Sequence, residues 1–246
     1  MTTQRGELVE AARVLSGLGL VTAYGHVSAR AGASMLITPA ADLATVTEST
    51  VVQVPLDASA LPAAAPAEAW AHLALYRARP DADSIARAQP ASAFAAAATT
   101  TSLVPLHGQA AWLGESIPVH GSAHLLRSAE LAERAARSLP TGEALLLRGN
   151  GALTLGATPG IAVARMWLLS AACDTWLAAH AAARAAGHAG GPAAEQAAGP
   201  AAGQATTDAT PLTTEEVASW RAVRDDLLPR LWQHLRRDQL GRGVML

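Results

Sequence analysis

Three side chains between Pro66 and Pro90 could perform proton-transfer chemistry on a small molecule. Glu68 supplies a carboxylate, Arg87 a guanidinium and Gln89 an amide. A carboxylate can take and return a proton, whereas a guanidinium and an amide can donate hydrogen bonds to negative charge that develops on a substrate. This combination is typical of a site that forms and stabilises an anionic intermediate.

The pattern around these residues predicts a helix and a strand that bring them together. Glu68 and His72 are four residues apart, so they share one face of a helix. Pro80 ends that helix, because proline disfavours helical backbone in the residue before it. The apolar strand Ser84 to Ala86 then places the guanidinium and the amide two residues apart, on one side of a sheet.

The composition predicts a large core of small side chains. Half of the 246 residues are apolar, alanine is the commonest of them, and aromatic residues make up only 4%. Helices that present alanine can pack closely against one another and against a sheet. The net charge is −2, and no run of basic residues supplies the positive patch that nucleic-acid binding requires. We therefore expect a small-molecule ligand or a second copy of the chain as partner, and no nucleic acid.

The ionisable residues exclude several kinds of site. The chain has no lysine, which rules out Schiff-base catalysis on a side chain and any phosphate loop that needs a lysine. Cys173 is the only cysteine, so we expect a buried thiol and no disulfide within the chain. No charged N-terminal region with an apolar core precedes the first predicted helix, and the most apolar later segment contains Arg165 and Asp174. These features predict a soluble, cytoplasmic protein that does not enter a membrane.

The rest of the chain alternates helices and strands, which predicts an α/β fold. The predicted helices span Arg5 to Leu18, Ala91 to Ala98, Ser128 to Leu139 and Ile161 to Ala186, and the predicted strands span Gly25 to Arg30, Ser34 to Thr38, Val51 to Leu56, Ser102 to Leu106, Ser116 to His120, Ala144 to Arg148 and Ala152 to Leu155. Asn150 lies between two glycines, which predicts a tight turn or a close approach of the backbone.

The chain divides into three predicted regions. Residues 1–186 would form one domain, residues 187–210 a flexible linker rich in Ala, Gly and Pro, and residues 211–246 a C-terminal amphipathic helix. Thr213 and Glu216 have the capping-box pattern at the start of this helix, and Pro229 is expected to bend it.

Four short motifs occur in a characteristic order. They are Gly25 to Arg30 (GHVSAR), Ile37 to Pro39 (ITP), Glu68 with Tyr76 to Asp81 (YRARPD), and Leu145 to Gly151 (LLLRGNG). Each motif alone is a weak signal, but together they resemble the class II aldolase/adducin family over residues 5 to 185. The histidine in GHVSAR, where the sugar-phosphate aldolases have asparagine, resembles the branch that decarboxylates hydroxylated or ring-opened aromatic acids.

This resemblance implies a three-layer α/β/α domain around a mostly antiparallel sheet, usually assembled as a tetramer. The chemistry of the family uses a divalent metal, usually zinc, held by two histidines at a strand end and one in a glycine turn. The matching positions here are Arg87, Gln89 and Asn150, and none is a histidine. Zinc needs imidazole, thiolate or carboxylate ligands, and a guanidinium brings positive charge to the place of the cation. We therefore expect no metal and no other cofactor.

Two interpretations of the three replaced positions stay open. In the catalytic one, Arg87 takes the place of the Lewis acid, with Gln89 and Asn150 as hydrogen-bond donors. Glu68 then transfers the proton. In the structural one, Arg87 fills the vacated metal site and pairs with Glu68, and the protein is not a catalyst. The polar character of all three replacements favours the catalytic interpretation, because drift in an alanine-rich chain would more readily leave alanine.

The resemblance also implies a set of substrate-binding residues near the predicted hairpin. The set contains Gly25, His26, Ser28, Thr38 and His72. Of these, His72 is expected to form a hydrogen bond behind Glu68. Ala40 and Ala41, like Pro66 and Ala67, stand where the phosphate-binding aldolases have residues that bind phosphate, so we expect a substrate without phosphate.

The sequence thus predicts a metal-independent carbon–carbon lyase that acts on a small, non-phosphorylated hydroxy-, oxo- or aromatic carboxylate. The reaction would be decarboxylation, retro-aldol cleavage or enolisation. The alternative is a repurposed relative, either a ligand-binding or scaffold protein without turnover, or a cyclase or dehydratase in a specialised pathway. The resemblance implies a homotetramer in both cases.

Overall fold

A mixed sheet of eight strands forms the centre of the computed structural model, which describes residues 3–189 and 209–242. The strands are β1 (His26–Ala31), β2 (Ser34–Ile37), β3 (Val52–Pro55), β4 (Ser84–Ala88), β5 (Ser102–Leu103), β6 (Ile117–His120), β7 (Ala144–Leu147) and β8 (Gly151–Gly156). Their order in the sheet is β3-β2-β1-β4-β8-β7-β6-β5. The pair β6 and β7 is parallel, and the other described neighbours are antiparallel, which confirms the mostly antiparallel sheet.

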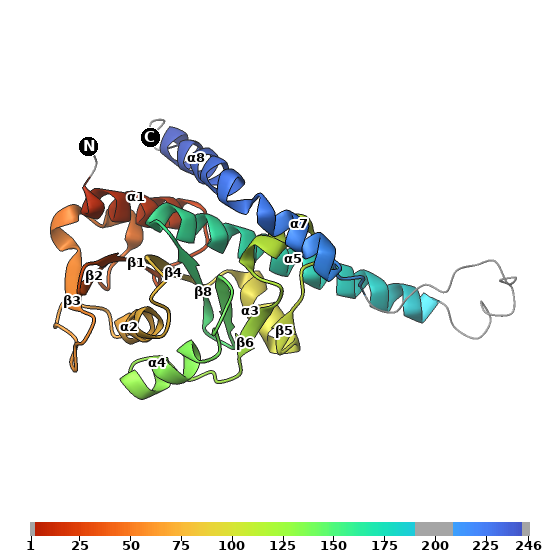
Figure 1. The fold of residues 1–246 in the computed structure, drawn as a ribbon, viewed down its shortest axis with the longest axis horizontal. Coiled ribbons are helices and arrows are strands. Elements are labelled where there is room, and N and C mark those ends of the chain that lie inside the picture. Colours follow the sequence, from red (N-terminus) through yellow and green to blue (C-terminus); the bar gives the residue numbers. More distant parts are fainter. Residues whose placement is uncertain (1–2, 190–208, 243–246) are drawn as a thin grey trace, which may run out of the picture.

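Helices cover both faces of this sheet and give the predicted three layers (Figure 1). The helices are α1 (Gln4–Gly17), α2 (Ala69–Ala78), α3 (Ala91–Thr99), α4 (Ala129–Ala136), α5 (Pro159–Ala189), α7 (Thr214–Ala222) and α8 (Arg224–Arg242), with short 3-10 helices η1 (Leu43–Thr45), η2 (Glu48–Thr50) and η3 (Gly108–Leu113). One apolar cluster joins α1, α3 and α5 to the sheet, and a second joins α2 and α4 to its other face.

The alternation of side chains along β4 decides which residues face which layer. Ala86 and Ala88 belong to the cluster on the α5 side, and Ile85 belongs to the cluster on the α2 side. Arg87 therefore points to the α2 side, where the sheet register places it opposite His26 of β1. Side chains directly opposite each other on antiparallel strands share one face, so β1 and β4 bring these two together.

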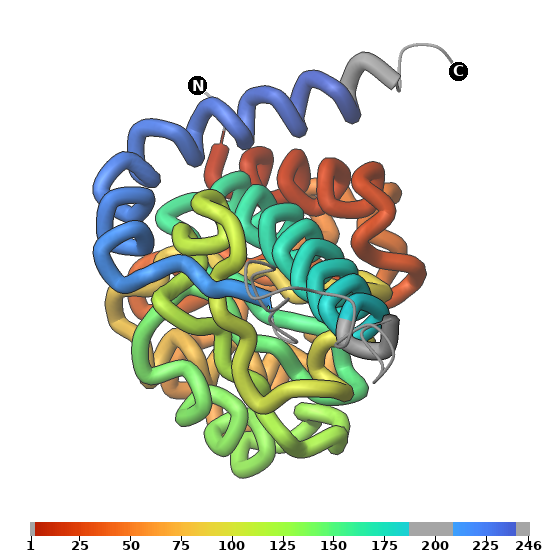
Figure 2. The backbone as a smooth tube through the Cα atoms, turned by 90° about the vertical axis from the view of Figure 1, so that its right-hand side faces the viewer, coloured from red at the N-terminus to blue at the C-terminus, as the bar shows by residue number. Residues whose placement is uncertain are grey.

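The C-terminal region contains two helices where the sequence predicts one. Thr213 and Glu216 form the predicted capping box at the start of α7, the chain turns at Val223, and Pro229 lies inside α8. Helix α8 contacts α5 and α1 of the same chain, as Figure 2 shows for the blue helix above the red one. Residues 190–208, which make up most of the predicted linker, lie outside the described residues, and α5 extends to Ala189.

Helix α5 is long and apolar enough to cross a membrane by length and composition alone. Its candidate span is Pro159–Ala186, with a mean hydropathy of 1.2, and 56% of the most apolar 18-residue stretch in this span is buried inside the protein. Its residues pack against β8, α3 and α1, which is the environment of a core helix. Cys173 is fully buried there, and burial raises the pKa of its thiol to about 12.

Candidate functional site

A cavity of about 600 Å³ lies where β1, β4 and the turn before β8 come together. Its lining residues are Thr22, Ala23, Tyr24, His26, Ala40, Ala41, Glu68, Arg87, Gln89, Phe94, Leu125, Arg127, Gly149 and Asn150. The four residues that the sequence assigns to catalysis are all in this set, together with His26. Residues from several separate stretches of the chain therefore meet at one place, because β1, β4 and β8 are neighbours in the sheet.

Arg87 is the most enclosed charged group of the cavity. Only 3% of the residue is exposed. Its Nη2 donates to Oδ1 of Asn150 at 2.6 Å. With the Gln89 amide turned so that its oxygen faces the guanidinium, Nη1 donates to Oε1 at 2.8 Å, and the Gln89 nitrogen donates to the carbonyl oxygen of Tyr24. Two neutral amides thus hold the guanidinium, and burial lowers the pKa of Arg87 without removing its charge.

The ion pair between Arg87 and Glu68 that the structural interpretation expects is not among the ion pairs of the described residues. Oε1 of Glu68 instead accepts a hydrogen bond from Nε of Arg127 at 2.9 Å. Glu68 is the residue that precedes α2, and Arg127 lies just before α4, which packs against α2. The sequence analysis missed Arg127, because no local spacing connects it to residues so far away in the chain.

Asn150 owes its position to two glycines with positive φ angles. Gly149 has φ 68° and Gly151 has φ 82°, both in the left-handed region that L side chains rarely adopt. A Cβ at Gly151 would overlap the carbonyl oxygen of Ala88. The backbone thus makes the tight turn and close approach that the sequence predicts. This turn brings the Asn150 amide beside Arg87.

The other predicted substrate-binding residues lie behind the cavity wall. Ser28 is fully buried, and its Oγ lies 2.7 Å from Nδ1 of His72 and 2.8 Å from the hydroxyl of Tyr76. Thr38 is also fully buried, and its Oγ1 accepts a hydrogen bond from the Val27 amide at 3.2 Å. Neither side chain lines the cavity, so both support the hairpin and α2 from within.

Gly25 and His72 likewise serve the wall of the cavity and do not line it. A Cβ at Gly25 would overlap the Val21 side chain, so the chain needs glycine to enter β1 at this point. The fully buried His72 ring lies 6.4 Å from the His26 ring in an edge-to-face arrangement. Of the predicted substrate-binding set, His26 is thus the member that lines the cavity.

Burial and neighbouring charges set the protonation states in the site. Burial, and then the positive charge of Arg87, lower the pKa of His26 to about 4, against a smaller opposing effect of Glu68. Burial also places the pKa of His72 well below its usual value. For Glu68, burial raises the pKa, but the hydrogen bond from Arg127 and the two positive charges outweigh it, so the pKa lies below its usual value. Both histidines are neutral and Glu68 is ionised near neutral pH.

Three buried polar atoms on residues that line the cavity have no partner within the described residues. They are Nδ1 of His26, Nε of Arg87 and Nδ2 of Asn150. A buried donor without an acceptor is costly, so a ligand with oxygen atoms in the cavity would stabilise these groups. Over the described ranges 3–189 and 209–242, no three His, Cys, Asp or Glu side chains are close enough together to hold a metal.

Three large apolar residues that line the cavity are exposed. They are Tyr24, Phe94 and Leu125, with exposed fractions of 71%, 37% and 51%. These residues account for half of the six large apolar residues that the described part of the chain exposes. Large apolar side chains gathered at one cavity indicate contact with an apolar partner or ligand.

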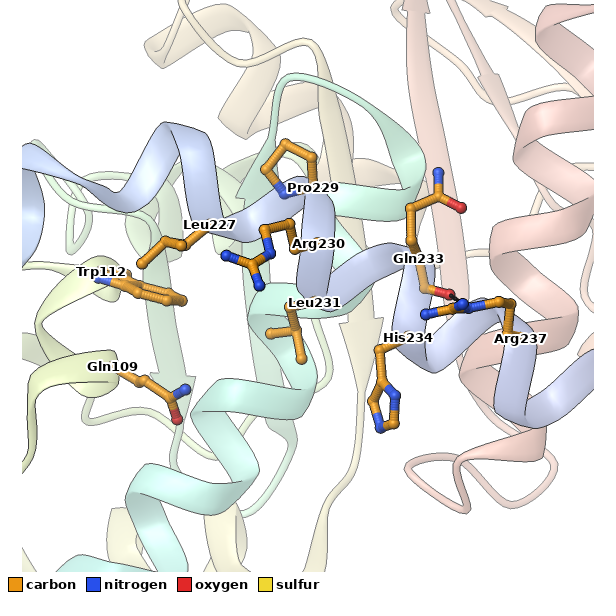
Figure 3. Close-up of a pocket in the computed structure, with 9 residues that line it drawn as sticks. All are labelled: Gln109, Trp112, Leu227, Pro229, Arg230, Leu231, Gln233, His234 and Arg237. Atoms are coloured by element: carbon orange, nitrogen blue, oxygen red, sulfur yellow. Dashed lines mark hydrogen bonds between the residues drawn. The ribbon is translucent and has the colours of Figure 1, made fainter.

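A second hollow, of about 660 Å³, lies between η3 and α8 (Figure 3). Its polar side chains, among them Arg230, His234 and Arg237, are exposed, and the buried Trp112 forms part of its apolar wall. Nε of Arg237 donates to the carbonyl oxygen of Gln233, one helical turn before it. No buried, unpartnered polar atom belongs to the residues that line this hollow, so it lacks the chemistry of the first cavity.

Comparisons with known proteins agree with the fold and with the motifs. The family model described as the Class II Aldolase and Adducin N-terminal domain matches residues 6–177. An L-fuculose-1-phosphate aldolase from Thermus thermophilus is 27% identical, with a TM-score of 0.65, and the alignment covers 72% of this chain and 95% of that one. No curated protein has a sequence that matches the chain.

Two further solved structures share the fold at lower identity. An aldolase II superfamily protein from Pseudomonas syringae has a TM-score of 0.73 at 21% identity, covering 97% of this chain and 92% of its own. YgbL from Escherichia coli, described as a candidate aldolase/epimerase/decarboxylase, has a TM-score of 0.66 at 19% identity, covering 88% and 97%. Because the family model matches most of its length, the chain belongs to the class II aldolase and adducin family.

Proposed function

We propose that the protein is a carbon–carbon lyase that works without a metal on a small, non-phosphorylated hydroxy-, oxo- or aromatic carboxylate. The observation that carries this proposal is the buried guanidinium of Arg87, whose hydrogen-bond partners within the described residues are two neutral amides. A buried cation without an anionic partner is costly, so its presence at the base of a cavity favours a ligand that carries or develops negative charge.

The side chains at the family's metal position do not fit a metal ion. Oδ1 of Asn150 already accepts a hydrogen bond from Arg87, and so does the oxygen of Gln89. The guanidinium itself would repel a cation and has no lone pair to offer. We therefore propose that the histidine ligands have been replaced and that hydrogen-bond donors do the work of the Lewis acid.

In a retro-aldol reaction, Glu68 would take the proton from the substrate hydroxyl. The carbon–carbon bond breaks, and its electron pair forms an enolate whose oxygen lies against Arg87 and Nδ2 of Asn150. Glu68 then returns the proton to the enolate carbon, so no external reductant or oxidant is needed. Each preorganised donor of this kind typically contributes about 10² to 10³ in rate.

Decarboxylation would use the same oxygen site. In a 3-oxo acid, the bond to the carboxylate breaks, carbon dioxide leaves, and the electron pair moves into the neighbouring carbonyl group to form an enolate held by Arg87. Glu68 passes a proton from solvent to the carbon. Neutral His26, opposite Arg87 on β1, can give or accept a hydrogen bond without adding charge to the site.

The substrate is proposed to lack phosphate, on the basis of two alanines in the cavity wall. Ala40 and Ala41 line the wall where a phosphate-binding relative would present residues that bind phosphate, and neither alanine carries a side-chain donor. We further propose that the protein is cytoplasmic. We also propose that it assembles as a homotetramer, and light scattering on the full chain would measure the number of subunits.

The variant Glu68→Gln tests the proposed function. With a panel of 3-oxo acids, 4-hydroxy-2-oxo acids and aromatic hydroxy acids, wild type should release carbon dioxide or an aldehyde, measured by NMR of the products. Glu68→Gln should fold normally and lose this turnover, whereas Glu115→Gln, an exposed glutamate outside the cavity, should keep it. Turnover should survive a strong chelator, and elemental analysis should find no stoichiometric metal.

Three outcomes would contradict the proposal. Full turnover by Glu68→Gln would remove the carboxylate from the mechanism. One equivalent of zinc at Glu68, Gln89 and Asn150 would show that the residues present do hold a metal. Tight ligand binding by wild type without any product would assign the cavity to a ligand-binding or scaffold protein.

A further inference from the structure

The side chains that line the cavity carry one more positive charge than negative charge. Arg87 and Arg127 are cations, Glu68 is an anion, and His26 is neutral near neutral pH because its pKa is about 4. The other lining residues are uncharged. A ligand with a single negative charge brings this balance to zero, whereas a dianion such as a phosphate monoester exceeds it.

Arg127 and Arg87 differ in their freedom to meet that ligand. Two amides fix the buried Arg87, but the side chain of Arg127 is 56% exposed and donates only through Nε, to Glu68. Its two Nη groups have no partner in the described part of the chain, and a guanidinium can grip a carboxylate through two parallel hydrogen bonds. An ion pair with one exposed partner is also held weakly, so Arg127 can exchange one carboxylate for another at little cost.

The present pair keeps Glu68 from acting as a base. The charges that affect Glu68 are those of Arg127 before α4 and Arg87 on β4, while His26 on β1 is neutral near neutral pH. Arg127 holds the carboxylate ionised and occupies one of its two oxygens, Oε1. Burial alone acts in the opposite direction and raises the pKa of Glu68. Removing Arg127 from Glu68 therefore turns a weak base into a stronger one.

The exposed apolar lining of the cavity indicates the rest of the ligand. Tyr24, Phe94 and Leu125 line the cavity and are exposed, and Leu125 is only two residues from Arg127. A ligand whose carboxylate reaches Arg127 therefore places its adjoining carbon skeleton among these side chains. An aryl or alkyl body would cover them, while a sugar would leave them in contact with hydroxyl groups.

We propose that Arg127 is the specificity-determining residue of the cavity, which binds the carboxylate of a monoanionic oxo or hydroxy acid with an apolar body and thereby releases Glu68. The substrate's carbonyl oxygen would then lie at Arg87 and its carboxylate at Arg127. The role given to the released Glu68 rests on the proposed function, but the exchange of partners by Arg127 is a binding event that does not depend on turnover.

Calorimetric titration with benzoylformate tests this exchange. Mandelate and phenylacetate serve as further apolar monocarboxylates, methyl benzoylformate as the uncharged analogue, and phenyl phosphate as the dianion. Wild type should bind the monocarboxylates at least about tenfold more tightly than the ester or the phosphate. Arg127→Gln should lose most of that preference. Arg134→Gln, an exposed arginine of α4 outside the cavity, should bind as wild type does.

Proton uptake distinguishes an exchange from simple attraction. When the ligand draws Arg127 away, the pKa of Glu68 rises, so binding at mildly acidic pH should take up protons, measured in two buffers of different ionisation enthalpy. Arg127→Gln and Glu68→Gln should both abolish this uptake. Without any ligand, carbon-13 NMR should show a higher pKa for Glu68 in Arg127→Gln than in wild type.

The outcomes separate this inference from the proposed function. Equal affinities for acid and ester, no binding of any of the three monocarboxylates, or an unchanged pKa of Glu68 in Arg127→Gln would overturn the role of Arg127, even if Glu68-dependent turnover exists. Conversely, proton-linked binding that needs Arg127 would stand even if no lyase reaction were found.

Discussion

Acidification should destabilise the protein through His26. This side chain is 5% exposed, and burial followed by the positive charge of Arg87 lowers its pKa to about 4 in the folded protein. The same group in an unfolded chain has a pKa of 6.5. Between these two values the unfolded chain binds a proton that the folded protein does not, so the free energy of unfolding decreases as the pH falls.

The size of the effect follows from the two pKa values. The contribution of His26 is fully present above pH 6.5 and is lost at about 1.4 kcal/mol per pH unit below it. At about pH 4.5, proton binding by the unfolded chain lowers the free energy of unfolding by about 2.5 kcal/mol relative to pH 7. His72 is buried as well and acts in the same direction. The prediction therefore concerns only that part of the pH-dependent loss of stability that disappears when His26 is removed.

Urea denaturation of wild type and His26→Asn, at about pH 7 and about pH 4.5, measures that part. The free energy of unfolding should fall by about 2.5 kcal/mol more in wild type than in the variant. His234→Asn, which removes an exposed histidine of α8, should follow wild type. If wild type and His26→Asn lose equal stability over this range, the His26 ring is protonated in the folded protein and the buried, neutral imidazole described above is wrong.

Three further predictions concern other parts of the fold. Arg87→Met should change the free energy of unfolding, measured in urea, by less than about 2 kcal/mol, because the loss of two hydrogen bonds is offset by the removal of a buried charge. A loss of stability above about 4 kcal/mol would show that Arg87 is a structural residue. Gly151→Ala should lower it by at least about 2 kcal/mol more than Gly32→Ala, since both glycines have positive φ but only Gly151 meets a backbone oxygen. Thr213→Ala should lower the free energy of unfolding by about 1 kcal/mol, because it removes the capping box of α7. Thr214→Ala leaves the capping box intact and should not cause this loss in thermal melts.

Most of the fold could be predicted from patterns local to the chain. The apolar alternation around GHVSAR and the Ala-Gly-Ala loop predicts the hairpin that β1 and β2 form. Helix α2 ends at Ala78, with Arg79 as its C-cap, directly before Pro80 and near the predicted place. What spacing could not give is the order of the strands, because pairing of β4 with both β1 and β8 joins segments far apart in the sequence.

The candidate site was less accessible to sequence reasoning. The carboxylate, the guanidinium and the amides were found from their types and from the resemblance, and the structure brings them to one cavity. The structural interpretation pairs Glu68 with Arg87, but the partner of Glu68 in the structure is Arg127. Without the fold, a buried guanidinium between two amides cannot be distinguished from one that faces a carboxylate. Ser28 and Thr38 have the right residue types for ligand contact, but their direction from the backbone turns them inward.

Because neutral amides hold the guanidinium of Arg87, the stability of the protein should depend on the anions in its solution. Any anion that reaches Arg87 in the folded state, and has no site on the unfolded chain, shifts the folding equilibrium by an amount that grows with the logarithm of its concentration. A melting-temperature screen of small carboxylates therefore reads out affinity for the cavity before any reaction is known. Buffers such as acetate or formate are ligands in that experiment and belong among the compounds compared, since the choice of buffer sets the baseline stability.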